Sequence, residues 1–172
     1  MIVVKYGLGV LLFCSVTVTA ALAAGKFETA TSTMVCGAAQ FKIESTCARS
    51  REEMTLNTCR QQVLTIVSNG KTVQKKLPEL NKRNVKSHKE AGGTLSDLYL
   101  TQWGCAGRGN ASVALIYYSV GGGNGAYSES MAFYDAAGNL IEKDRDPRYA
   151  KAIADGMEKL APVPSIMPTE GP

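Results

Sequence analysis

The sequence predicts an all-β domain with one C-terminal helix, in which an antiparallel meander forms a sandwich or a partly closed barrel stapled by two disulfides. Three observations favour this fold class. Strand-like runs alternate with glycine-rich turns in the second half of the chain, an Asn-Gly pair separates two apolar runs in the first half, and four cysteines follow an export-type segment. A chain of 172 residues is long enough to bury one substantial core.

Residues 1–23 have the pattern of a signal peptide. A single lysine precedes an apolar run from Tyr6 to Val18, and Ala21-Leu22-Ala23 is a small-x-small cleavage site. The run is shorter than the roughly 20 residues that a membrane-spanning helix requires. We therefore expect export to the periplasm or the medium, no transmembrane segment after cleavage, a single exported β-rich domain over 24–160, and a proline-rich flexible tail over 161–172.

The predicted mature chain keeps four of the five cysteines, because Cys14 leaves with the signal peptide. An even number of cysteines in an exported chain predicts disulfides. Three connectivities are possible, and the sequence does not separate them. No two of the four stand two to four residues apart as in a structural zinc site, so we expect neither a metal nor another cofactor. The disulfide candidates are Cys36, Cys47, Cys59 and Cys105.

In the first half, the strongest signal is a β-hairpin closed by Asn69-Gly70. This pair accepts the positive φ angles of a type I′ turn, so it predicts that Ser68 pairs with Lys71 and that Ile66 pairs with Val73. Two shorter strands are expected upstream, over Gln40–Thr46 and Glu53–Cys59. The polar stretch Pro78–Gly93 has no clean periodicity and predicts a long loop, with at most a helical turn.

Three strands are expected in the second half, over Leu95–Trp103, Ala111–Val120 and Ala126–Asp135, separated by residues 104–110 and 121–125. The middle run is apolar on both faces, which predicts a central strand covered on both sides. A phosphate-binding role for the glycines of 121–125 is disfavoured because a strand follows them, not a helix.

Two further elements complete the chain. The turn Asp135–Gly138, with Gly138 at its left-handed position, leads into the apolar residues of 139–142. A helix is then predicted from Asp146, as N-cap, to Leu160. Its expected apolar stripe consists of Ala150, Ile153, Met157 and Leu160.

The charge pattern places most of the basic excess in one segment. Without Lys5 the chain has 18 basic and 15 acidic residues, a formal charge of +3. The cluster could contact an anionic partner such as lipid headgroups or an acidic protein patch, or it could be a solvated loop. It contains no aromatic residue to stack a base, so nucleic acid is not expected. Its members are Lys71, Lys75, Lys76, Lys82, Arg83, Lys86 and Lys89.

No residue pattern indicates a reaction. The single histidine, His88, lies among lysines in the predicted polar loop, where we expect it on the surface without a catalytic partner. Carboxylate pairs suitable for hydrolysis are available in any chain with 15 acidic residues, so they carry little information. Aromatic residues concentrate in the second half, where core packing is the more frequent role.

The expected function is therefore non-enzymatic binding of a protein in the exported compartment, as an inhibitor or an immunity-type protein. A carboxylate-dependent hydrolase and a small-ligand carrier are the alternatives. The candidate binding residues surround the predicted loop after Cys105: Arg108 at its centre, Trp103 supporting the strand beneath, Gly107 and Gly109 permitting close approach of a partner, and Asn110. An ordinary hairpin connection is the competing interpretation. Neither the partner nor the oligomeric state follows from the sequence.

Overall fold

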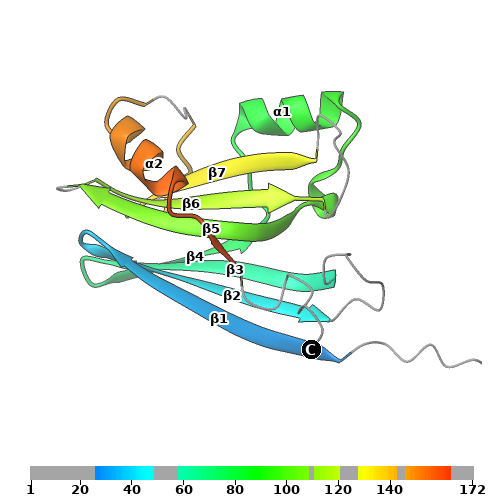
Figure 1. Ribbon diagram of the computed structural model, residues 1–172, viewed down its shortest axis with the longest axis horizontal. Coiled ribbons are helices and arrows are strands. Elements are labelled where there is room, and N and C mark those ends of the chain that lie inside the picture. The colour runs from blue at the N-terminus through cyan, green and yellow to red at the C-terminus, as the bar shows by residue number, and fades with distance from the viewer. Residues whose placement is uncertain (1–25, 49–57, 109–110, 121–127, 143–145, 164–172) are drawn as a thin grey trace, which may run out of the picture.

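The protein is a sandwich of two four-stranded antiparallel sheets, seen in a computed structural model that describes residues 26–48, 58–108, 111–120, 128–142 and 146–163. Figure 1 shows the sheets as two layers, with both helices beside the second sheet. The strand orders are β1-β2-β3-β4 and β7-β6-β5-β8. This arrangement confirms the predicted fold class of an all-β, partly closed sandwich with two disulfides. The predicted signal peptide lies outside the described residues.

The first sheet contains β1 (Phe27–Cys36), β2 (Ala39–Ala48), β3 (Thr58–Ser68) and β4 (Lys71–Leu77). The second contains β5 (Tyr99–Arg108), β6 (Ala111–Ser119), β7 (Glu129–Asp135) and β8 (Ala161–Pro162). The helices are α1 (Lys82–Glu90) and α2 (Ala150–Met157), and a short 3₁₀ helix covers Leu95–Asp97.

The predicted Asn-Gly hairpin is confirmed. Asn69 and Gly70 have φ angles of 51° and 73°, and β3 and β4 pair in the expected register, with Ser68 opposite Lys71. The strand expected over 40–46 is the centre of β2, whereas only the end of the one expected over 53–59 lies in the described part of β3. The strand β1 was not predicted. Half of its residues are polar, and because it is the edge strand of the first sheet none of its residues is fully buried, so its sequence lacks a strong apolar pattern.

The polar stretch 78–93 is not a long loop, because its centre forms α1. The side chain of Asn81 caps the helix by accepting a hydrogen bond from the Asn84 backbone amide at 2.8 Å. His88 is only 3% exposed, and its Nε2 donates to the Thr94 carbonyl at 3.0 Å. A Cβ on Gly93 would lie 2.5 Å from that nitrogen, so the glycine lets the chain close over the ring. The prediction of a surface histidine is therefore wrong.

The central strand β6 is covered on both sides, as predicted. Ile116 and Tyr118 belong to the core between the sheets, whereas Val113 and Leu115 pack in a second core beneath α2. The predicted loop over 104–110 is wrong at its start, because β5 continues to Arg108 and pairs with β6. Backbone pairing with β6 and burial of residues 104–106 outweigh the low strand propensity of the glycines there.

The C-terminal helix is shorter than predicted, and its buried face is different. It begins at Ala150, and the Asp146 side chain instead accepts the Arg148 amide in the preceding turn. Ala152, Ile153 and Gly156 are buried, whereas Met157 is 41% exposed. A Cβ on Gly156 would lie 2.4 Å from a methyl of Leu115, so small residues face the sheet and permit close docking.

The predicted flexible tail also needs correction at its start. Residues 161–162 form β8, which pairs with β5 opposite Gln102 and Trp103. The next residue, Val163, is buried and donates its amide to the Thr101 carbonyl at 2.9 Å. Backbone hydrogen bonds to an otherwise open edge of β5 therefore hold this segment on the domain. The remainder of the tail lies outside the described residues.

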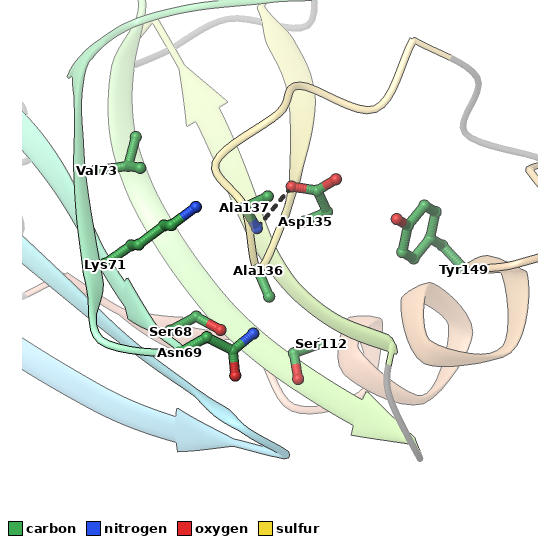
Figure 2. A pocket seen from close by; sticks show the side chains of 9 residues that line it. All are labelled: Ser68, Asn69, Lys71, Val73, Ser112, Asp135, Ala136, Ala137 and Tyr149. Atoms are coloured by element: carbon green, nitrogen blue, oxygen red, sulfur yellow. Dashed lines mark hydrogen bonds between the residues drawn. The ribbon is translucent and has the colours of Figure 1, made fainter.

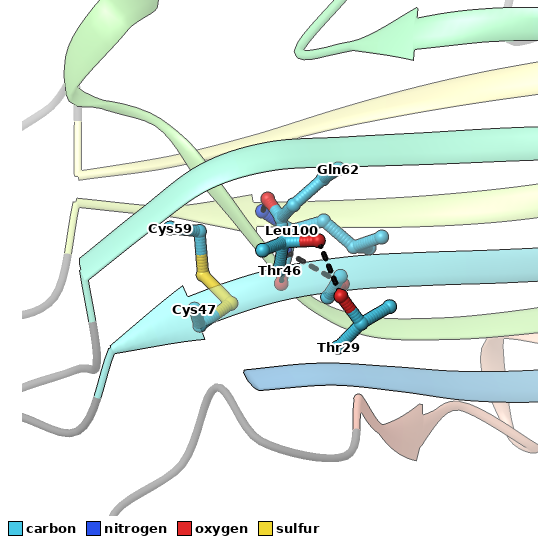
Figure 3. The surroundings of a disulfide bond; sticks show 7 residues. Thr29, Thr46, Cys47, Cys59, Gln62 and Leu100 are labelled. Carbon is cyan, nitrogen blue, oxygen red and sulfur yellow. Dashed lines mark hydrogen bonds between the residues drawn. A yellow bond between two sulfur atoms is a disulfide. The ribbon is translucent and has the colours of Figure 1, made fainter. Parts of the chain in front are cut away.

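Two disulfides fasten the fold in different ways. Cys36–Cys105 joins β1 to β5 and thus one sheet to the other, whereas Cys47–Cys59 joins neighbouring strands of the first sheet (Figure 3). The four cysteines are therefore paired with one another, and the two bonds indicate an oxidising environment.

A buried side chain adds a further link between the sheets near the second disulfide. Gln62, on β3, donates to the Leu100 carbonyl at 3.0 Å and accepts from the Leu100 amide at 2.8 Å. Its amide thus satisfies the backbone of β5 where the register with β6 shifts. Figure 3 shows both residues beside the Cys47–Cys59 bond.

Candidate binding cleft at the hairpin end

Four chain reversals lie at one end of the sandwich, which we call the hairpin end. They follow β1 at Gly37, β3 at Asn69, β5 at Arg108 and β7 at Asp135. The reversals after β5 and β7 lie together, as the sequence predicts for a meander, because Arg108 pairs with Ala111 and Val113 pairs with Asp135. The Cys36–Cys105 bond brings the reversal after β1 beside the reversal after β5. A shared cleft lies between the reversal after β3 and the reversal after β7.

The cleft between the two sheets at this end has a volume of about 440 Å³ (Figure 2). One wall comes from the β3–β4 hairpin, and the other comes from β6, the turn after β7 and the residue before α2. The side chains in Figure 2 show the Lys71 ammonium directed toward the turn and the Tyr149 hydroxyl directed toward Asp135. The lining residues are Ser68, Asn69, Lys71, Val73, Ser112, Asp135, Ala136, Ala137 and Tyr149.

The turn that forms the second wall is held by its own aspartate. The Asp135 carboxylate accepts hydrogen bonds from the backbone amides of Ala137 at 2.9 Å and Asn139 at 2.8 Å. Gly138 has a φ angle of 81°, and a Cβ there would lie 2.7 Å from a methyl of Val73. The glycine thus provides the left-handed turn and also lets the turn abut β4. Hydrogen bonds within the turn and its contact with Val73 therefore hold this wall in place.

A second cleft of about 450 Å³ continues from the first and shares Asp135 and Tyr149 with it. Arg148 lies along this part, where its guanidinium donates to both oxygens of Asp146 and is 5.3 Å from the centre of the Tyr149 ring. Burial, and secondarily the Asp135 carboxylate, raises the pKa of the Tyr149 hydroxyl. The phenol therefore stays neutral near pH 7 and can donate or accept a hydrogen bond.

Two of the candidate binding residues make close contacts within the domain. Trp103, on the same strand as Arg108, is fully buried, and its indole Nε1 donates to the Ser32 hydroxyl at 3.2 Å, so it links the two sheets beneath the end of β5. Gly107 permits a close approach, but to the protein itself: a Cβ there would lie 2.6 Å from the backbone nitrogen of Gly37.

The other candidates lie at or beyond the tip of the same hairpin. Arg108 ends β5 at the hairpin end, whereas Gly109 and Asn110 lie outside the described residues. Of the cleft residues, the sequence singled out Lys71 only as a member of the basic cluster, and it did not single out Ser112 or Tyr149 for binding. The turns beside them were predicted, but no sequence signal indicated that turns from different sheets would face each other.

Comparisons with protein-family models, with curated proteins and with solved structures each gave no match. Among the described residues, no helix has the length and apolar character needed to cross a membrane.

Proposed function

We propose that the protein is an exported, non-enzymatic binding protein that holds a protein partner at the hairpin end, as an inhibitor or an immunity-type protein does. The observation that carries this proposal is the convergence of turns from both sheets around a cleft with both polar and apolar lining. The hydrogen-bonded Asp135 turn restrains one wall of the cleft, and the Cys36–Cys105 bond ties the two sheets together at the same end of the sandwich. Restrained loops lose less conformational entropy on binding, which favours affinity. The disulfides support action outside the reducing cytoplasm, in the periplasm or the medium.

The arrangement of the core supports a protein partner over a small ligand. The space between the sheets is filled by large side chains, among them Trp103, Tyr118 and Phe41. A carrier would therefore have to use the open cleft at the end of the sandwich. That cleft is bounded by protruding turns and continues around Tyr149, a shape that suits an inserted polypeptide loop.

The carboxylates of the cleft support binding over hydrolysis. Asp135 accepts the backbone amides of its own turn, and Asp146 is paired with Arg148 through two oxygens. Glu142, which lines the second cleft, accepts the Lys82 backbone amide at 3.3 Å. All three acids thus have structural partners, whereas a hydrolase needs one carboxyl group as proton donor and another to activate water or attack the substrate.

Site-specific photo-crosslinking tests the proposal. A photoreactive residue is placed at Asn69 or at Ala137, both exposed on the cleft, and the protein is incubated with the exported fraction of its source cells. Ser96 serves as the control because it is exposed and precedes β5, at the opposite end of the sandwich. We expect both cleft positions to capture the same protein and the control position to capture none.

The captured partner, once purified, permits a quantitative test. Lys71→Ala should weaken its binding by about three- to fivefold, whereas Lys159→Ala, which removes the same charge from the end of α2, should not. Equal capture at the control position would place the contact elsewhere. A small molecule that co-purifies with the protein, and that the purified partner does not displace, would favour a small-ligand carrier instead.

A further inference from the structure

Three lysines form a row along one side of α1. Lys82, Lys86 and Lys89 are separated by four and three residues, so they lie on the same helix face, and all three are exposed. This arrangement works against helix stability in two ways. Like charges at these spacings repel, and Lys82 places a positive charge in the first turn, where the helix dipole is already positive. The Glu142 carboxylate, which accepts the Lys82 backbone amide at 3.3 Å, offsets only part of this charge.

A shallow apolar groove runs beside this row. Its volume is about 400 Å³, its floor contains Leu80 and Val85, and its rim contains the three lysines and Glu90. Lys86 pairs with Glu90 at 3.7 Å, but both side chains are mostly exposed, so water screens the pair. Within the described residues, Lys82 and Lys89 form no ion pair. The groove thus combines an apolar floor with a positively charged rim.

We propose that this α1 groove is a second binding surface, which takes an acidic polypeptide segment by seating one apolar side chain between the lysines. The groove is large enough to seat a large apolar side chain, and the charge of the rim is complementary to acidic neighbours of that side chain. A bilayer would require exposed apolar groups that insert into it. The large hydrophobic residues exposed in the described structure are Phe27, Val35, Val67 and Met157, and none of them lies on α1.

The α1 groove and the cleft at the hairpin end share no lining residue. The Lys82 backbone amide does donate to Glu142 of the second cleft at 3.3 Å, but this hydrogen bond does not use the Lys82 side chain. The Asn84 amide side chain donates to the Met131 carbonyl at 3.0 Å, which fastens α1 beside the first half of β7. The cleft is lined instead by the last residue of β7, Asp135, and by the turn that follows it. Variants of one surface should therefore leave binding at the other unchanged, and the two proposals can fail separately.

Fluorescence anisotropy with labelled peptides tests the proposal on the intact domain. The probe is a heptapeptide with a central phenylalanine between three acidic residues on each side, and its partner probe has alanine at the centre. At about 20 mM salt, where screening is weak, we expect the triple variant Lys82→Ala, Lys86→Ala and Lys89→Ala to bind the phenylalanine probe at least about tenfold more weakly. The control variant removes the same charge elsewhere, through Lys26→Ala, Lys151→Ala and Lys159→Ala.

The apolar part of the groove has its own readout. The alanine probe should bind at least about fivefold more weakly than the phenylalanine probe, because it leaves the floor of the groove unfilled. Equal weakening by the control variant, equal binding of the two probes, or no binding of either would each overturn the proposal. Binding to vesicles containing about 30 mol% anionic phosphatidylglycerol, without binding to either peptide, would overturn it in favour of a membrane surface.

Discussion

Removal of the Cys36–Cys105 disulfide should destabilise the protein more than removal of Cys47–Cys59. The first bond closes a sequence separation of 69 residues and the second a separation of 12. The loss of chain entropy in the unfolded state corresponds to about 4 kcal/mol for the longer loop and about 3 kcal/mol for the shorter one. The longer bond also joins the two sheets, whereas the shorter one joins strands that hydrogen bonds already pair.

Double Cys→Ala variants make this comparison without introducing a free thiol. Urea unfolding can be followed by the fluorescence of Trp103, which is the single tryptophan of the chain and is fully buried. We expect the free energy of unfolding to fall by about 4 kcal/mol without Cys36–Cys105 and by about 3 kcal/mol without Cys47–Cys59. In the unmodified protein produced from residue 24, thiol titration after unfolding should find no free thiol.

The result that would refute this reasoning is an equal loss of stability for the two variants, within about 0.5 kcal/mol, or a larger loss without Cys47–Cys59. Either outcome would mean that loop length does not control the contribution of these bonds, and that strain or residual structure in the unfolded chain does. A free thiol in the unmodified protein would contradict the disulfide pairing itself.

Three further predictions follow from buried or crowded groups. Gly107→Ala should lower the free energy of unfolding by about 1–3 kcal/mol although the site is exposed, because its Cβ would meet the Gly37 backbone at 2.6 Å; an unchanged urea midpoint would contradict this. Burial raises the pKa of the Tyr118 and Tyr134 hydroxyls above the unfolded value near 10, so their neutral forms stabilise the fold below pH 10. Above pH 10 that stability should fall by about 1.4 kcal/mol per pH unit for each tyrosine, and Tyr134→Phe should reduce the slope in urea titrations across that range. His88→Ala should leave partner binding unchanged but lower thermal stability, since it removes a buried ring and its hydrogen bond; a hundredfold loss of function at unchanged thermal stability would instead indicate catalysis.

Elements with strong local signals could be predicted from the sequence. Asn69-Gly70 determines its own turn because both residues accept positive φ angles, and Gly138 does so for the same reason. The apolar character of both faces of β6 required cover on two sides, which the opposite sheet and α2 provide. The cysteine count predicted two disulfides, whereas their connectivity depended on which strands the fold placed side by side.

The sequence by itself thus determined the alternation of strands and turns, the tight turns and the cysteines available for pairing, because these depend on residues close together in the chain. Only the tertiary structure decided that 82–90 would be helical, that His88 would be buried, and that 161–163 would complete a sheet edge. It also decided that Lys71 and Tyr149 would face one cleft. These outcomes depend on contacts between distant segments, where burial and backbone hydrogen bonding outweigh local propensity, and no short window of sequence contains both partners.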